Sequence, residues 1–121
     1  MIEIKKVSQD DLRHDDIGLM YFNKELFTGV SVWFWGNGQL GSEINYVDGI
    51  QNGWSRGWYE NGRIQGETYY KNECVDGVNR EWYENGQIKL DSEIRKGKPI
   101  WKKEWDEQGN LINELAKPSG E

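Results

Sequence analysis

The sequence has almost none of the residues from which a catalytic centre or a disulfide framework is built. It contains one cysteine, Cys74, and one histidine, His14. A single cysteine forms no internal disulfide, and this pair is too small a ligand set for a zinc site of the usual kind. No Ser/His/Asp or Cys/His nucleophile can be assembled around His14. The sequence therefore predicts a protein that is not an enzyme and that carries no metal or cofactor.

Long apolar runs and an excess of basic residues are also missing. No segment approaches the ~18 apolar residues that suggest a membrane span, and the first residues hold no apolar run of signal-peptide length. We therefore expect a cytoplasmic protein without membrane contact. The net charge is −6, with an excess of two negative charges in each of residues 1–29, 30–75 and 76–121. Nucleic-acid binders normally carry the opposite sign, so a basic protein partner fits better, although ordinary solubility explains the same charge.

Glycine and aromatic residues are abundant instead. There are 15 glycines, seven tryptophans, six tyrosines and three phenylalanines, against two prolines. Frequent glycine with little proline favours many tight turns. Only 36% of the residues are apolar, so a thin core rich in large rings is expected, buried as a strip rather than as a ball.

A seven-residue pattern occurs four times in phase. It runs from an aromatic residue through Asn-Gly or Gln-Gly to Leu or Ile, at residues 34–40, 58–64, 82–88 and 105–111. The copies are 24, 24 and 23 residues apart, and a half-copy precedes them at residues 21–25. A second turn signal separates the copies, at Asp48-Gly49, Asn72-Glu73 and Lys96-Gly97.

Two turns per repeat predict two strands of about seven to nine residues, and no stretch has helical apolar spacing. The predicted fold is all-β, an antiparallel up-and-down meander of about four β-hairpin repeats and eight or nine strands in a single elongated twisted sheet. Residues 1–121 are expected to form one domain. It comprises an N-terminal segment (1–20), the repeats (21–114) and a tail (115–121).

The register of each hairpin follows from its loop. A three-residue loop at Glu60-Asn61-Gly62, with the glycine in the left-handed conformation, pairs Trp58 with Ile64. The same rule pairs Phe34 with Leu40, Trp82 with Ile88, and Trp105 with Leu111. It gathers Val30, Val32, Phe34, Leu40, Ile44 and Tyr46 on one face, whereas a one-residue slip scatters them. We therefore expect Phe34, Trp58, Trp82 and Trp105 to form a buried column.

The opposite, polar face is then the candidate binding surface. Rings at Trp33, Trp35, Tyr59 and Tyr69 would lie there beside Glu43 and Glu67, as anchors for a basic partner. The alternative is cross-strand packing that only stabilises the sheet. An acidic cluster of Asp10, Asp11, Asp15 and Asp16 could extend the surface. Its spacing does not match an EF-hand, and its alternative is a solvated loop.

The repeated pattern, followed by Glu-x-x-Tyr and then Asp-Gly, resembles a bacterial variant of the MORN repeat over about residues 20–114. The resemblance implies no catalytic residues. Bacterial proteins made only of such repeats are usually described as antitoxins or as immunity proteins against secreted toxins. We accordingly expect a protein that binds and neutralises a cognate toxin, plausibly a basic nuclease. The alternatives are a carbohydrate or cell-wall-binding repeat module and a general protein-interaction scaffold. A phospholipid scaffold is disfavoured by the negative charge.

Overall fold

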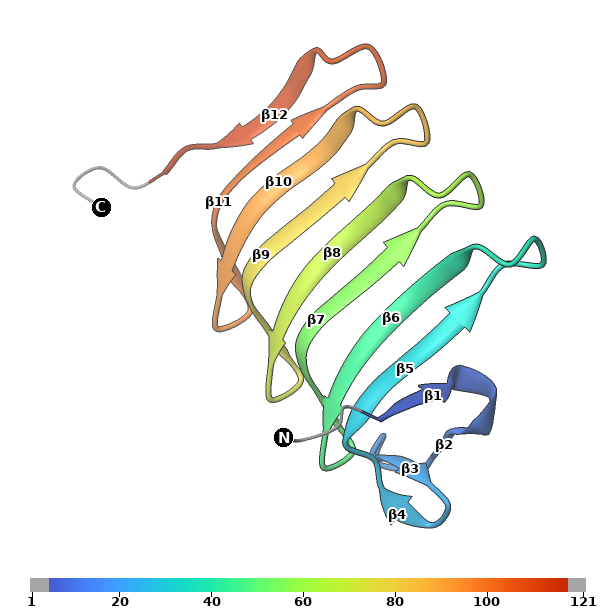
Figure 1. Ribbon diagram of the computed structural model, residues 1–121. Coiled ribbons are helices and arrows are strands. Elements are labelled where there is room, and N and C mark those ends of the chain that lie inside the picture. The colour runs from blue at the N-terminus through green and yellow to red at the C-terminus, as the bar shows by residue number, and fades with distance from the viewer. Residues whose placement is uncertain (1–4, 118–121) are drawn as a thin grey trace.

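The computed structural model describes residues 5–117, which consist mainly of β-strands (Figure 1). The strands are β1 (Lys6–Ser8), β2 (Arg13–His14), β3 (Met20–Phe22), β4 (Glu25–Leu26), β5 (Gly29–Phe34), β6 (Leu40–Val47), β7 (Ile50–Trp58), β8 (Ile64–Lys71), β9 (Cys74–Trp82), β10 (Ile88–Arg95), β11 (Lys98–Trp105) and β12 (Leu111–Leu115). One 3-10 turn, η1 (Gln9–Asp11), follows β1. Within residues 5–117 no helix has the length and apolar character needed to span a membrane.

Strands β5 to β12 form the predicted antiparallel meander. Each strand pairs with the next one along the chain, which makes four successive hairpins. Figure 1 shows them as a row of curved strands, with the loops of the four hairpins aligned along one side. The predicted fold class is confirmed, with eight strands in the meander.

The loop of each hairpin has the predicted three-residue form. In the second hairpin the Tyr59 amide donates to the Arg63 carbonyl at 2.8 Å, and the Gly62 amide donates to the Tyr59 carbonyl at 2.9 Å. Gly62 has φ +89°, a left-handed conformation that glycine adopts without steric cost. The four predicted pairs are all present: Phe34 with Leu40, Trp58 with Ile64, Trp82 with Ile88, and Trp105 with Leu111.

One extra residue after each loop changes the register of the rest of the hairpin. In the first hairpin Phe34 pairs with Leu40 but Trp33 pairs with Ser42, which leaves Gly41 as a β-bulge. The same shift occurs in the other three hairpins. Because the bulge reverses the alternation, Ile44 and Tyr46 lie on the face of Trp33. The prediction that they share a face with Val30, Val32 and Phe34 is wrong.

The two faces of the sheet therefore differ from those predicted. We call one the tryptophan face, defined by a row beside the loops: Phe34, Leu40, Trp58, Ile64, Trp82, Ile88, Trp105 and Leu111. The other is the serine face, defined by a central row: Ser31, Ile44, Ser55, Thr68, Asn79 and Ser92. Beyond residue 50, only Ser92 is buried in the described part of the chain. The predicted buried column is thus a half-exposed row, and Phe34 at its start is 55% exposed.

The hydrophobic core lies at the N-terminal end. Val7, Leu12, Phe27 and Tyr46 are buried together, with Met20, Phe22 and Ile44 packed around them. The N-terminal residues thereby cover the serine face of the first repeat. The predicted half-copy does not join the main sheet, because β3 and β4 form a separate three-stranded sheet with β2. Strand β1 pairs with β5 in parallel and makes the main sheet nine-stranded.

Candidate functional site

A row of charges of alternating sign crosses the tryptophan face, next to the row of rings, leucines and isoleucines that defines this face, which we call the aromatic row. Each strand from β6 to β12 contributes one residue, and the strand pairings place neighbours opposite one another. The row consists of Glu43, Arg56, Glu67, Arg80, Asp91, Lys103 and Glu114. We call it the charge ladder.

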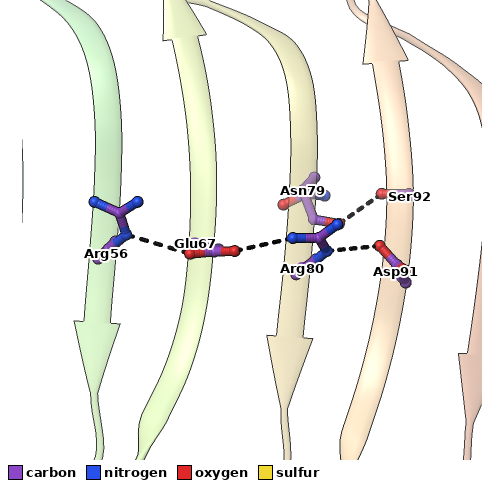
Figure 2. A network of polar contacts seen from close by, with 6 residues as sticks. All are labelled: Arg56, Glu67, Asn79, Arg80, Asp91 and Ser92. Carbon is purple, nitrogen blue, oxygen red and sulfur yellow. Dashed lines mark hydrogen bonds and ion pairs between the residues drawn. The ribbon is translucent and has the colours of Figure 1, made fainter.

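The centre of the charge ladder is a connected set of ion pairs (Figure 2). Arg56 Nε donates to Glu67 Oε2 at 3.2 Å, and Arg80 Nη1 donates to Glu67 Oε1 at 3.3 Å. Arg80 Nε also donates to Asp91 Oδ1 at 2.9 Å. The hydrogen bond to Asp91 is the main cause that raises the pKa of Arg80 above its ordinary value. Glu67 is held between two arginines, and its side chain is 14% exposed. The negative charge of its carboxylate is therefore already balanced by positive charges within the protein.

The aromatic row and the charge ladder place large rings beside arginine side chains on one face of the sheet. Large rings recur on alternate strands, so equivalent rings of successive repeats are roughly 10 Å apart, two strand spacings. Farther along the same face, the Arg56 guanidinium lies 4.3 Å from the centre of the Trp54 ring, which meets the Tyr69 ring edge-on at 5.2 Å. Tryptophan, tyrosine and arginine are the residues enriched at binding hot spots.

The structure does not bring the predicted site residues to one surface. Glu43, Glu67 and Tyr69 lie on the tryptophan face, whereas Trp33 lies on the serine face. Trp33 packs edge-on against Trp35 at 4.8 Å. A side chain at Gly41 would collide with the Trp33 ring, so tryptophan at 33 requires glycine at the bulge.

Trp35 and Tyr59 are used to join consecutive repeats. Trp35 Nε1 donates to the Trp58 carbonyl at 2.9 Å, and Tyr59 Oη donates to the Trp82 carbonyl at 2.6 Å. Tyr83 makes the equivalent bond one repeat later, at 2.8 Å. The asparagines of the loops add a second set of bonds, because Asn37, Asn61 and Asn85 each donate to a carbonyl of the next loop. We call these bonds loop latches, and they favour the stabilising alternative for Trp35 and Tyr59.

The last loop has a different arrangement. Asp106 occupies the position of Tyr59 and Tyr83, and its Oδ1 accepts from the amides of Gln108 at 3.0 Å and Asn110 at 2.9 Å. These bonds, that of Asn110 first, hold the pKa of Asp106 below its ordinary value. The final loop is therefore closed on itself.

The acidic cluster is divided between structural and exposed residues. Asp15 accepts from the amides of Ile17 at 3.1 Å and Leu19 at 2.9 Å and from the Tyr21 hydroxyl at 3.2 Å. Desolvation alone would raise the pKa of Asp15, but these bonds outweigh it and lower the pKa. Asp10, Asp11 and Asp16 are exposed. All four belong to the N-terminal unit that packs on the serine face, so they do not extend the tryptophan face.

The serine face is hollowed in several places. A groove of about 310 Å³ crosses its middle, over Ser55, Gly57, Gly66 and Thr68. A cavity of about 320 Å³ lies under the N-terminal unit, and His14 is part of its lining. Within residues 5–117 no three His, Cys, Asp or Glu side chains are grouped so that they could hold a metal ion.

The fold defines a β-hairpin repeat protein, with one half-exposed apolar row and one charged row running the length of the array. The family described as MORN repeat variant matches residues 27–48, 51–72 and 75–93, just over half of the chain, and the chain belongs to this family. Each matched segment falls on one hairpin, and the fourth hairpin, β11–β12, lies outside the match. A comparison with curated proteins finds no match.

The charge ladder was missed at the sequence level, although its signal is present. Acidic residues recur at 43, 67, 91 and 114, with the same spacings of 24, 24 and 23 as the loops. Basic residues recur at 56, 80 and 103. Aligning all repeats by position, rather than only their loops, would have revealed it.

Proposed function

We propose that this protein is a non-catalytic binding protein that docks a partner protein on its tryptophan face. The observation that supports this proposal is the row of partly exposed apolar side chains that runs along the whole array. Phe34 at one end is 55% exposed, Leu111 at the other is 49% exposed, and the residues between are half-buried. Extended apolar patches on soluble proteins usually mark interaction surfaces.

The charges refine the kind of contact expected. Because Glu67 is engaged by Arg56 and Arg80, the charge ladder offers little net charge to a partner. Docking there would depend on apolar burial and on arginine hydrogen bonds. The net charge of −6 acts at longer range, where it would speed the approach of a basic partner.

We further propose that the partner is a toxin, which the protein neutralises in the cytoplasm as an antitoxin or immunity protein. The support is the resemblance of the repeats to those of such proteins, together with an acidic charge that suits a basic nuclease. This role involves no direct contact with nucleic acid or membrane.

The test compares the two faces of the sheet. The protein encoded beside this gene would be co-expressed to score protection from toxicity, and its affinity would be measured by calorimetry. Trp58→Ala should weaken binding by about 2 kcal/mol, roughly 30-fold, because it removes a central ring of the row. Ser55→Ala, the matched control on the serine face, should bind as the wild type does. Both variants would first be shown to be folded by circular dichroism.

The outcomes separate the two levels of the proposal. Equal binding by Trp58→Ala and the wild type would rule out the tryptophan face as the docking surface. A neighbouring gene product that is neither toxic nor bound would contradict the antitoxin role.

The spacing of the rings favours one second candidate, a carbohydrate-binding module. Trp58, Trp82 and Trp105 recur at roughly 10 Å, a spacing at which successive rings could stack on alternate sugars of a β-linked chain. Titration with chitohexaose, followed by tryptophan fluorescence, distinguishes this candidate. Saturable quenching that Trp58→Ala abolishes would favour the carbohydrate role over protein docking.

A further inference from the structure

The charge ladder has a regular internal order. In each of the first three repeats, an acid on the second strand of the hairpin faces a cation on the strand that follows. These pairs are Glu43 with Arg56, Glu67 with Arg80, and Asp91 with Lys103. Glu114 on β12 is the fourth acid of the series. The next strand, which would supply the fourth cation, is absent from residues 5–117.

Strand β12 forms an open edge. It pairs with β11 on one side, and no strand in the described chain pairs with its other side. All five of its residues are exposed, and Ile112 and Leu115 are 61% and 44% exposed. Such an edge presents unpaired backbone donors and acceptors, and natural proteins usually protect it with lysine, proline or a covering segment. Strand β12 contains neither of these residues, and its protection is limited to the bulge at Ile112 and the charge of Glu114.

The other end of the array shows how such an edge is filled. Strand β1 adds to β5 as a single short strand, and the Val30 amide donates to the Lys5 carbonyl at 2.8 Å. At the β12 end, Asp106 stands where Tyr59 and Tyr83 donate to the next repeat and accepts bonds within its own loop, so the hydroxyl latch to a further repeat is missing. The edge is therefore suited to one added strand rather than to a whole hairpin.

We propose that the outer edge of β12 binds an extended segment of a partner protein, antiparallel, with a lysine or arginine opposite Glu114. Backbone hydrogen bonds would supply affinity and the cation would fix the register. A second copy pairing through its own β12 is the poorer occupant, because the sequence Leu-Ile-Asn-Glu-Leu offers Glu114 no cation. This inference concerns the sheet edge and does not depend on the tryptophan face.

The test uses the strand that already fills this role one repeat earlier. The probe is a synthetic peptide with the sequence of β11 (Lys98–Trp105), in which Lys103 faces an acid in the native sheet. It would be titrated into the full chain and followed by amide chemical shifts. Saturable shifts should appear along β12, and reversal of the peptide charge at Lys103→Glu should weaken binding by roughly fivefold.

Two matched variants make the test specific. A Lys102→Glu peptide has the same net charge as the Lys103→Glu peptide, but the changed residue faces Ser92 in the native sheet. Its affinity for the protein should therefore fall by less than twofold. The Glu114→Lys protein should bind the wild-type peptide more weakly and should regain affinity for the Lys103→Glu peptide.

Three results would overturn the proposal. The first is the absence of shifts in β12, and the second is an equal loss with the two charge-reversed peptides. The third is a dimer in sedimentation velocity that Ile112→Pro abolishes, since that would assign the edge to a second copy.

Discussion

The hydroxyl groups of Tyr59 and Tyr83 each donate a hydrogen bond to a backbone carbonyl of the next repeat. In Tyr59→Phe the ring stays, but the Trp82 carbonyl loses its 2.6 Å donor. We expect the free energy of unfolding to fall by about 1 kcal/mol, as for a typical intramolecular hydrogen bond. The measurement is urea unfolding followed by fluorescence. Tyr69→Phe is the control, because the Tyr69 hydroxyl makes no hydrogen bond within the described residues, and a loss as large as that of Tyr59→Phe would contradict the latch.

Asp106 makes the last loop sensitive to acid. Its pKa in the folded protein lies below the ordinary value of 3.8, so the charged form is stabilised by folding. Its contribution to stability is therefore present above about pH 4 and is lost as the pH falls through the folded pKa. The amides of Gln108 and Asn110, followed by NMR, should shift in that window. The stability difference between the wild type and Asp106→Asn should shrink as the pH is lowered, and a difference independent of pH would argue against this role.

Within the elements, the charge ladder should contribute unequally along its length. Glu67→Gln leaves Arg56 and Arg80 without the carboxylate that joins them, and we expect a loss of about 1–2 kcal/mol in a urea titration. Glu114→Gln at the open edge breaks one pair at 3.6 Å, with the Glu114 side chain 42% exposed, and should cost less than about 0.5 kcal/mol. Similar losses for both variants would mean that the central ion pairs do not act as a network.

The aromatic row should stabilise the sheet less than a buried core would. A fully buried tryptophan would cost about 3–5 kcal/mol on truncation, but Trp82 is half-buried. We expect about 1–3 kcal/mol for Trp82→Ala in the isolated protein, measured by thermal or urea unfolding. A loss above about 4 kcal/mol would show that something covers the row.

The sequence predicts the hairpins well because their information is local and repeated. The Asn-Gly loops and the flanking rings recur in phase, and a glycine with positive φ follows from the loop type. The bulge could not be predicted in this way, because the extra residue differs between repeats: it is Gly41, Gln65, Lys89 or Ile112. Because of that single residue, Glu43 lies on the tryptophan face and Ile44 on the serine face, the reverse of the prediction. The residues of the predicted site are consequently divided between the two faces. The parallel pairing of β1 with β5 involves only three residue pairs and does not recur along the chain. No pattern in the sequence therefore predicts it.

At the scale of the whole molecule, stability should decline from the N-terminal end to the C-terminal end. The core formed by Val7, Leu12, Phe27 and Tyr46 supports the first repeat, whereas later repeats contact mainly their neighbours. In repeat arrays, the free energy of local opening of a repeat depends mainly on the interfaces with its nearest neighbours. We expect amide exchange to be slowest in β5 and β6 and fastest in β12. Leu12→Ala should speed exchange in β5 and β6 first, and uniform acceleration across the chain would indicate a single cooperative unit instead.

Strand β1 has a further consequence for association. A sheet with two open edges can join copies head to tail without limit, which is how fibres grow. Here one edge ends in a strand of three residues that carries Lys6, runs parallel to its neighbour β5 and leads directly into the 3-10 turn η1. The two ends of the array therefore differ, because the β1 end presents an edge strand of three residues and the β12 end presents one of five exposed residues. Because the β1 end offers only three residues for strand pairing, we expect head-to-tail addition of copies to stop there, so that the β12 edge stays open without fibre growth.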